Sequence, residues 1–362
     1  MKRIAIFNSS IEAGDAISND MLGMYEVLLN QGHEAGLFAE ESSVAGYPVQ
    51  PIEEMRYFLA QPEDIAIYHF ATGWGLGLKL LKEMKCRKVI KYHNVTPPHF
   101  FAGVNSDYEH VCRMGRWQLA ELAKHEVDLY LADSEYNRRE LIVFGANASR
   151  SKVVPPFHHI DRLIAIEADL EVLDCYNDED INIVMVGRLV PNKGHQALIE
   201  AFAIYHGRYN PQSRLLIVGA EDLRLRPYTD ALHQKTKNYG LENRIIFTGK
   251  VSDAALKAHY LIADVFLIVS RHEGFCVPLV EAMSMKIPVI AHACTAIPHT
   301  VGKTGIVWDE EDPELMAASV NTLAQDPDLR LALGEMGWQR YQTQYTTKQI
   351  AADFIETLSH LL

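Results

Sequence analysis

Residues 265–283 read VFLIVSRHEGFCVPLVEAM, and this stretch decides the fold. Five apolar residues lead through a short polar loop into a second apolar segment that begins near Pro278. A short apolar run suits a buried strand, and proline is favoured in the first turn of a helix. The stretch therefore predicts a strand, a loop and a helix, which is the repeating unit of parallel sheets.

The same alternation continues on both sides of this unit, so two tandem Rossmann-like layers of class α/β are expected. Strands are expected at residues 3–7, 34–38, 65–68, 88–92, 129–133, 152–154, 181–186, 214–218, 244–248, 265–269, 289–293 and 305–308. Helices are expected at residues 19–31, 114–125, 195–205, 229–239, 253–262, 279–284 and 313–325.

A change of composition separates the two layers. An irregular, acidic stretch follows Pro155 and Pro156, and a buried strand opens at Ile181. We place the hinge near residues 156–180, with an N-terminal domain at 1–158 and a C-terminal domain at 159–345. Ligands bind at the carboxyl ends of parallel strands, so two facing sheets predict a site in an interdomain cleft.

The composition limits the class of protein. The 362 residues carry a formal charge of −13, which argues against nucleic-acid binding. Five cysteines without C-x-x-C spacing predict free thiols in a reducing compartment. No stretch approaches the roughly 18 apolar residues that span a bilayer, and the N-terminus lacks a signal-peptide core. A cytoplasmic protein is expected.

Residues 79–91, KLLKEMKCRKVIK, carry six basic side chains and one acidic one. Such a segment could attract anionic lipid or a phosphorylated acceptor, which would place the protein peripherally at the inner face of a membrane. The alternative is a solvated helix face that runs into a strand.

Two acids, Glu273 and Glu281, flank the start of the predicted helix at 279–284. In a continuous helix they would lie about 12 Å apart along the axis, farther than the roughly 5–9.5 Å between paired glycosidase carboxylates. That separation suits the two ends of a nucleotide-sugar. The backbone amides of Gly274, Phe275 and Cys276 would face an anion there. The alternative is a polar helix start with one exposed glutamate.

Residues 187–195, GRLVPNKGH, directly follow the strand expected at 181–186. Arg188 and Lys193 suit a diphosphate, because arginine offers a bidentate fork and lysine a point charge. No Ser or Thr follows the lysine, so this is not a Walker A loop. Taken alone, the segment could equally be a surface turn.

In the first domain, His93 follows a predicted strand and begins the segment HNVTPP. A histidine there is either structural or turned toward a ligand. The loop after the first strand contains a single glycine, Gly14, and lacks G-x-G-x-x-G, which weakens a dinucleotide-dehydrogenase interpretation.

Together, residues 187–195 and the E-G-F-x-x-P-L-x-E-A-M pattern at 273–283 resemble the family 4 (group 1) retaining glycosyltransferases of GT-B fold, and HNxTPP resembles bacterial mannosyltransferases. The resemblance is detailed in the C-terminal domain and loose in the N-terminal one. It implies that residues 346–362 form a helix that packs back on the first domain.

The resemblance also implies roles for individual residues. Arg188 and Lys193 would neutralise the departing diphosphate, Glu273 would bind sugar hydroxyls beside the amides of residues 274–276, and Glu281 would hold the ribose. Gly14 would let its loop approach the phosphates, and His93 would hydrogen-bond the transferred sugar. The main chain at Lys250 and Val251 would meet the base. Two departures, Cys276 for a common glycine and His299 for a common glutamate, affect the donor contacts.

The resemblance implies a metal-independent, retaining hexosyltransferase with no cofactor, whose co-substrate is a nucleotide-sugar. GDP-mannose is the first choice of donor, and a saccharide or lipid-linked saccharide of a surface polysaccharide is the expected acceptor. The alternatives are a transferase that uses UDP-glucose or UDP-GlcNAc, a nucleotide-sugar 2-epimerase, and a non-catalytic glycan-binding protein of the same fold.

Two metal motifs are weighed and set aside. Asp178-Glu179-Asp180 has the D-x-D form of another glycosyltransferase fold, but it precedes a strand, so a solvated hinge is expected. His158 and His159 lack a third ligand at useful spacing.

Overall fold

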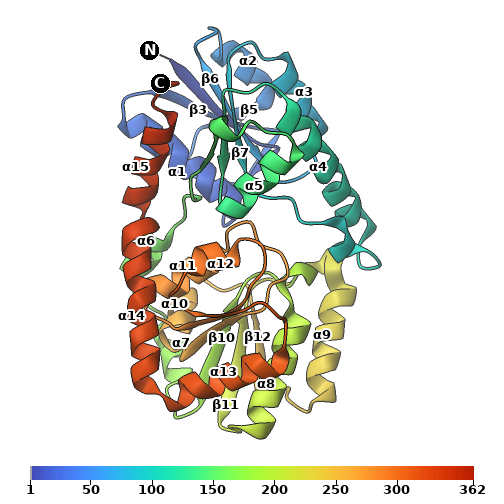
Figure 1. Ribbon diagram of the computed structural model, residues 1–362, viewed down its shortest axis with the longest axis vertical. Coiled ribbons are helices and arrows are strands. Elements are labelled where there is room, and N and C mark those ends of the chain that lie inside the picture. The colour runs from blue at the N-terminus through green and yellow to red at the C-terminus, as the bar shows by residue number, and fades with distance from the viewer. Residues whose placement is uncertain (1) are drawn as a thin grey trace. The chain divides into compact units, whose positions relative to one another are not determined.

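The computed structural model describes residues 2–362, and the chain forms two compact units. The N-terminal unit contains residues 2–99, 107–159 and 347–362, and the C-terminal unit contains residues 100–106 and 160–346. Figure 1 labels the helices and several strands of both.

The N-terminal unit is built on a seven-stranded sheet of order β5-β3-β1-β6-β7-β8-β9, in which every pairing is parallel. A short parallel pair, β2 and β4, lies apart from it. The strands are β1 (Arg3–Phe7), β2 (Ser10–Ile11), β3 (Glu34–Ala39), β4 (Glu41–Ser42), β5 (Val49–Pro51), β6 (Ile65–Phe70), β7 (Arg87–Tyr92), β8 (Leu129–Ala132) and β9 (Ser151–Val153).

Both faces of this sheet are covered, because alternate strand residues point to opposite sides. Ala5 and Phe7 join a core with helices α3, α4 and α5, whereas Ile4 and Ile6 join a core with α1 and α15. The C-terminal helix α15 contributes Phe354, whose ring meets that of Phe157 edge-on at 6.0 Å. The helices are α1 (Ala16–Asn30), α2 (Met55–Phe58), α3 (Gly75–Glu83), α4 (Ser106–Lys124), α5 (Glu135–Phe144) and α15 (Thr347–Leu358).

The C-terminal unit has a six-stranded parallel sheet of order β12-β11-β10-β13-β14-β15. Helices α8, α9 and α13 cover one face, and α6, α10, α11, α12 and α14 contribute to the core of the other. The strands are β10 (Ile181–Val186), β11 (Ser213–Val218), β12 (Ile245–Gly249), β13 (Val265–Ile268), β14 (Val289–His292) and β15 (Ile306–Trp308). The helices are α6 (Ile160–Ala165), α7 (Leu170–Cys175), α8 (His195–Arg208), α9 (Arg226–Asn238), α10 (Asp253–Leu261), α11 (Val277–Ser284), α12 (Ile297–Val301), α13 (Pro313–Gln325) and α14 (Pro327–Gln344).

The expected strands and helices are confirmed, apart from shifts at their ends. The largest shift is in α4, which begins at Ser106 rather than at residue 114. The expectation of an irregular segment at 156–180 is wrong, because α6 and α7 lie there. Ile160 and Leu163 of α6 are buried in the core of the C-terminal unit, which explains why this segment is ordered.

Residues 100–106 belong to the C-terminal unit, although they were expected in the first domain. Val104 packs against the core beside α8 and α9. The side-chain amide of Asn105 donates a hydrogen bond to the carbonyl of Arg224 at 2.9 Å. The Phe100 ring lies 6.2 Å from that of His272, immediately before Glu273.

Candidate functional site

The loops after β10 and β13 bring Lys193 and Glu273 together. Lys193 Nζ lies 2.7 Å from Glu273 Oε1, and the two side chains are 16% and 8% exposed. Burial lowers the pKa of Lys193, but the Glu273 carboxylate opposes it and the net pKa lies above the usual value. Lys193 therefore stays charged.

Glu273 is also held by its neighbours. Ser270, directly after β13, donates its hydroxyl hydrogen to the same Oε1 at 2.6 Å. The Thr295 hydroxyl accepts from the Glu273 amide at 2.8 Å and donates to the Glu273 carbonyl at 2.7 Å. No described residue donates a hydrogen bond to Oε2, so this oxygen is available to a ligand. Thr295 and Ser270 were not identified from the sequence.

The turn that carries Lys193 depends on Gly194. Its φ is +72°, and a Cβ there would lie 2.0 Å from the Val269 carbonyl oxygen. Only glycine permits this approach of the β10 loop to the end of β13. The predicted Arg188 is exposed and forms no ion pair with a described residue, although its charge lowers the pKa of Lys193. Its guanidinium group can therefore meet an anion.

The peptide around Cys276 adopts an uncommon conformation just before α11. Cys276 is buried with φ of +76°, in the left-handed region that favours glycine. We find no hydrogen bond from the amides of Gly274, Phe275 and Cys276 to the described residues. A run of unpaired amides before a helix is a suitable place for an anion or a hydroxyl oxygen.

The second acid, Glu281, lies within α11 beside α10. Tyr260 of α10 donates its hydroxyl hydrogen to Glu281 Oε2 at 2.6 Å. Burial raises the pKa of Glu281, the Tyr260 hydrogen bond lowers it and Asp253 raises it, to about 7. The predicted Lys250 and Val251 lie between β12 and α10, with Lys250 exposed and Val251 partly buried.

In the N-terminal unit, Gly14 immediately precedes α1 with φ of +82° and open space around its Cβ position. Asp15 then caps the helix, and its carboxylate accepts a hydrogen bond from the amide of Ser18 at 2.9 Å. Gly14 thus shapes a loop at the carboxyl end of β1.

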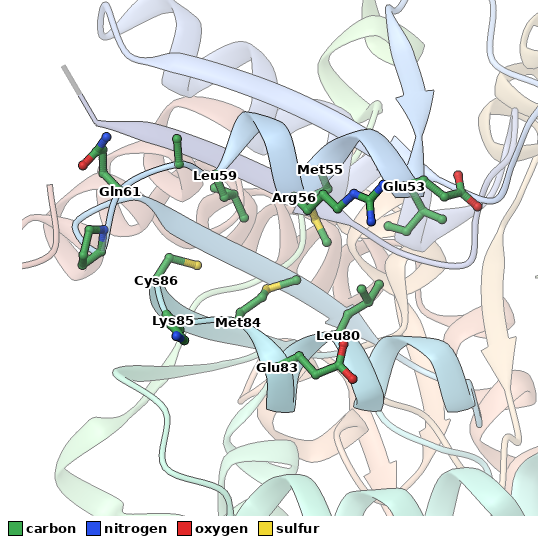
Figure 2. A pocket seen from close by; sticks show the side chains of 13 residues that line it. Glu53, Met55, Arg56, Leu59, Gln61, Leu80, Glu83, Met84, Lys85 and Cys86 are labelled. Carbon is green, nitrogen blue, oxygen red and sulfur yellow. The ribbon is translucent and has the colours of Figure 1, made fainter.

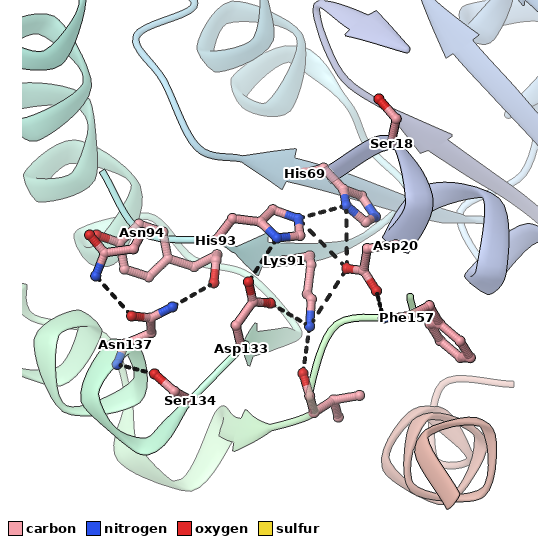
Figure 3. A network of polar contacts seen from close by, with 12 residues as sticks. Ser18, Asp20, His69, Lys91, His93, Asn94, Asp133, Ser134, Asn137 and Phe157 are labelled. Atoms are coloured by element: carbon pink, nitrogen blue, oxygen red, sulfur yellow. Dashed lines mark hydrogen bonds and ion pairs between the residues drawn. The ribbon is translucent and has the colours of Figure 1, made fainter. Parts of the chain in front are cut away.

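His93 follows β7, and both of its ring nitrogens are engaged within the N-terminal unit (Figure 3). Nδ1 lies 2.9 Å from Asp133 Oδ2, and Nε2 lies 2.9 Å from His69 Nδ1. Its side chain is 5% exposed. A sugar hydroxyl that uses His93 Nε2 must therefore replace His69.

Four further residues complete this cluster and were not recognised from the sequence. Lys91 is fully buried, with Nζ 2.8 Å from Asp133 Oδ1 and 3.7 Å from Asp20 Oδ2. His69 and Asp133 lie at the carboxyl ends of β6 and β8, next to β7 in the sheet. The sequence did contain a signal for this cluster, because a histidine lies within the apolar strand 65–70 and a lysine within the strand 87–92.

The acids of the D-x-D motif form ion pairs with arginines. Asp178 pairs with Arg214, and Asp180 lies 3.2 Å from Arg214 and 2.5 Å from Arg244. Asp180 is therefore not freely solvated, contrary to expectation. Among the described residues, neither these acids nor the His158-His159 pair falls in a cluster with the proximity of metal ligands.

The basic stretch at 79–91 is not one exposed face. Lys79, Lys82 and Lys85 are exposed, whereas Arg87 and Lys88 are partly buried and Lys91 is enclosed. Only α3 and the turn after it therefore present exposed lysines, which fits either a solvated helix face or a contact with anionic lipid. Across residues 2–362, no helix has the combined length and apolar character that crossing a bilayer requires.

Lys85 borders a hollow of about 570 Å³ in the N-terminal unit (Figure 2). Met55, Leu59 and Met84 give it an apolar wall. Gln61, which precedes β6, and Cys86, which precedes β7, also line it. The hollow therefore lies at the amino ends of these strands, whereas His93 follows the carboxyl end of β7. Ligands of parallel sheets bind at the other, carboxyl edge, and no predicted site residue lines this hollow.

Most of the C-terminal unit is similar to known proteins. Residues 176–340 match the family described as glycosyl transferases group 1. The GDP-mannose-dependent alpha-(1-6)-phosphatidylinositol monomannoside mannosyltransferase of Mycolicibacterium smegmatis is 30% identical over 238 residues, which are 62% of this chain and 60% of that protein. The D-inositol 3-phosphate glycosyltransferase of Kineococcus radiotolerans is 28% identical over 63% of this chain and 55% of its own length. The match thus spans little more than half of these relatives.

Solved structures show the same fold over the whole chain. HepE of Anabaena, in complex with UDP and glucose, has a TM-score of 0.78 at 19% identity and covers 99% of this chain and 100% of its own. The sucrose-phosphate synthase of Thermosynechococcus elongatus has a TM-score of 0.79 at 18% identity, over 100% and 99% of the two chains. The fold is GT-B, as expected.

Proposed function

We propose that this chain is a group 1 glycosyltransferase, the family that residues 176–340 match, and that it transfers a hexose from a nucleotide-sugar to a saccharide with retention of configuration. The observation that carries the proposal is the Lys193–Glu273 pair, with Nζ and Oε1 2.7 Å apart. This pair places a cation for the diphosphate next to an acid for the sugar hydroxyls.

Each end of the donor has a suitable partner in the C-terminal unit. The exposed Arg188 offers a guanidinium fork, and Lys193 has two further ammonium hydrogens besides the one directed at Glu273. Glu273 Oε2 would accept a sugar hydroxyl near the amides of residues 274–276. Glu281 would accept the ribose hydroxyls, and the main chain at Lys250 and Val251 would contact the base.

In the mechanism we propose, the acceptor attacks the anomeric carbon on the face that the diphosphate leaves. The departing diphosphate takes the acceptor's proton, and Arg188 and Lys193 stabilise the charge that develops on it. These cations replace a metal, so the reaction should need none. Glu273 Oε1 already accepts hydrogen bonds from Lys193 and Ser270, which suits a binding group better than a nucleophile.

GDP-mannose is the donor we propose. The mannosyltransferase of M. smegmatis, named as GDP-mannose-dependent, supports this choice at 30% identity. The HepE structure with UDP-glucose favours UDP-glucose as the second candidate. The acceptor we propose is a saccharide or lipid-linked saccharide in surface or extracellular polysaccharide biosynthesis. The reaction would take place in the cytoplasm, with Lys79, Lys82 and Lys85 directed to the inner face of a membrane.

A direct test measures binding and turnover of pure donors. Titration calorimetry with GDP-mannose and UDP-glucose should show binding of one of them, and NMR of the product should show the anomeric configuration of the donor. Full turnover is expected in EDTA. An inverted linkage, a covalent sugar adduct on Glu273, or complete loss of turnover in EDTA would each contradict the mechanism.

Two other functions predict different outcomes. A 2-epimerase would convert UDP-GlcNAc without any acceptor, whereas a transferase would leave it unchanged or slowly hydrolyse it. A non-catalytic binding protein would keep its biological activity after Glu273→Ala. Lys79→Ala is the matched control, because Lys79 is exposed on α3 and should leave the kinetics with soluble acceptors unchanged.

A further inference from the structure

Two threonines of the segment after β14 hold the loop that carries Glu273. Thr295 Oγ1 accepts a hydrogen bond from the Glu273 amide at 2.8 Å and donates to the Glu273 carbonyl at 2.7 Å. Thr300 of α12 is 1% exposed, and its hydroxyl donates to the Phe275 carbonyl at 2.8 Å. The same hydroxyl lies 3.2 Å from the Ala296 carbonyl, so Phe275 is its closer acceptor. Both threonines thus contact the main chain of the loop and fix the orientation of its peptide groups.

These contacts decide where two amide hydrogens of the loop point. A peptide group is planar and trans, so its C=O and its N–H point in opposite directions. No described peptide bond is cis. The Glu273 carbonyl is directed at Thr295, so the amide hydrogen of Gly274, in the same peptide group, points away from Thr295. By the same geometry, the contact with Thr300 turns the amide hydrogen of Cys276 away from Thr300.

The two amides are available to a ligand. Neither the Gly274 amide nor the Cys276 amide donates a hydrogen bond to a described residue, whereas the Glu273 amide is occupied by Thr295. Cys276 is buried, and a buried N–H without a partner is costly, so native structures normally supply one. The orientation that the threonines impose therefore keeps two donors free at the proposed donor site.

The backbone of Thr295 shows that its contact with Glu273 is retained at a cost. The φ of Thr295 is +43°, in the left-handed region, which is a rare conformation for a β-branched residue. Strained residues persist where the surrounding structure holds them, and they cluster at functional sites. A glycine at position 295 would relieve the strain, but it would lose both hydrogen bonds to Glu273.

The loop is also held from the side of β10. The side-chain amide of Asn192, between β10 and α8, donates to the His272 carbonyl at 3.1 Å. The peptide between His272 and Glu273 is therefore fixed at both of its polar groups, since Thr295 holds the amide end. This peptide gives the loop a fixed start, and Thr295 and Thr300 orient peptides that follow it.

We propose that Thr295 and Thr300 are positioning residues, which aim two amide hydrogens of the loop at oxygens of the donor. These are the hydrogens of Gly274 and Cys276. The inference rests on the proposed function and deepens it. The oxygen belongs to the diphosphate or to a sugar hydroxyl, because an amide hydrogen can bond to either. Each threonine acts through a peptide group, and all of these residues belong to the C-terminal unit.

The test measures the affinities of three kinds of ligand: nucleotide-sugar, nucleoside diphosphate and nucleoside monophosphate. We would titrate GDP-mannose, GDP and GMP, and then UDP-glucose, UDP and UMP. Valine has the shape of threonine, so Thr295→Val and Thr300→Val remove little more than a hydroxyl. Each should weaken binding of the nucleotide-sugar roughly tenfold and leave the monophosphate unchanged. Thr295→Ser and Thr300→Ser keep the hydroxyl and should restore the wild-type affinity.

The diphosphate distinguishes the two sources of the oxygen. If the amides bind the diphosphate, the valine variants should weaken the nucleoside diphosphate as much as the nucleotide-sugar. If the amides bind a sugar hydroxyl, only the nucleotide-sugar should be weakened. Equal weakening of all three ligands, or of none, would overturn the inference, because a merely structural role of the hydroxyls predicts no difference among the ligands.

Two further variants separate positioning from stability. Thr295→Gly relieves the backbone strain but lacks the hydroxyl, so it should fold and still bind the nucleotide-sugar as weakly as Thr295→Val. A glycine variant that binds like the wild type would contradict the inference. Thr236→Val is the matched control, because Thr236 is also a buried threonine of this unit, and its hydroxyl donates to the Leu232 carbonyl within α9 at 3.1 Å. It should leave all three affinities unchanged.

Amide NMR of the wild-type protein needs no variant to fold. The amide resonances of Gly274 and Cys276 should shift when the nucleotide-sugar binds, and not when the monophosphate binds. Unchanged resonances with bound nucleotide-sugar would refute the inference and leave the proposed function standing. A wild-type protein that binds neither GDP-mannose nor UDP-glucose would refute the proposed function, and this inference with it.

Discussion

Lys193 and Glu273 are 80 residues apart in the chain, yet Nζ and Oε1 of these residues lie 2.7 Å apart in the C-terminal unit. The β10 loop carries the cation and the β13 loop carries the acid, and β10 and β13 are neighbours in a parallel sheet. The loops that follow neighbouring parallel strands lie together at the carboxyl edge of the sheet. The pair therefore follows from the order of the strands, and it gives the proposed donor site its charge.

Removing one partner of this pair should destabilise the protein more than removing both. Lys193→Met leaves the Glu273 carboxylate without its cation in a mostly buried site, at a cost of about 3 kcal/mol in the free energy of unfolding. Lys193→Met/Glu273→Gln should recover much of this loss and remain inactive. Urea unfolding and turnover assays measure the two effects. A double variant as unstable as Lys193→Met would show that the pair is not coupled.

Arg188→Ala should separate stability from activity. The side chain is exposed and forms no ion pair with the described residues, so the unfolding midpoint should change little. Donor affinity and turnover should fall by roughly two orders of magnitude or more, because a guanidinium bonded to the diphosphate is lost. Lys82→Ala is the control, since Lys82 is an exposed base outside the proposed site. Equal losses in both variants would point to a general charge effect.

Donor binding should depend on pH through Glu281. Its pKa in the folded protein is about 7, and only the ionised carboxylate accepts hydrogen bonds from both ribose hydroxyls. Affinity should therefore rise as the pH increases through about 7. Glu281→Gln should bind more weakly and lose this dependence. Calorimetric titrations between pH 6 and 8 would check it, with phosphate ionisation of the ligand controlled by titrating the variant under the same conditions.

Glu281 should also make the stability of the protein depend on pH, but in the opposite direction to donor affinity. The pKa of Glu281 is raised from 4.5 in the unfolded chain to about 7, so the folded protein binds more protons between these values. Its contribution to the free energy of unfolding should decline as the pH rises from about 4.5 to 7. Glu281→Gln should remove this part of the pH dependence, which thermal unfolding across the range would detect.

At position 276 a glycine variant should be more stable than an alanine variant, which reverses the usual order of the two residues. The φ of +76° at Cys276 is strained for any residue with a Cβ, by about 1 kcal/mol. Cys276→Gly and Cys276→Ala both lose the buried sulfur, but only glycine relieves the strain. Cys276→Gly should therefore be the more stable of the two in urea unfolding. A more stable alanine variant would mean that packing outweighs backbone conformation there.

Much of the fold could be predicted from the sequence because apolar strands and amphipathic helices alternate regularly. The 18-residue helix α14 was missed, since it packs through small residues rather than an apolar stripe. A Cβ at Gly334 would lie 2.0 Å from the Lys286 carbonyl oxygen, so the helix approaches a loop through glycine. Such a contact leaves no hydrophobic period to detect.

The sequence by itself determined the parallel α/β layers and the residue types of the C-terminal site, including Arg188, Lys193 and Glu273. These signals are local, because each motif lies in a single strand–loop–helix unit. Only the tertiary structure decided that Lys193 pairs with Glu273, and that Lys91 leaves the basic stretch to join Asp20, His69 and Asp133 around His93. The physical reason is that burial and hydrogen-bond partners depend on which strands are neighbours, and strand order is not written in any one segment.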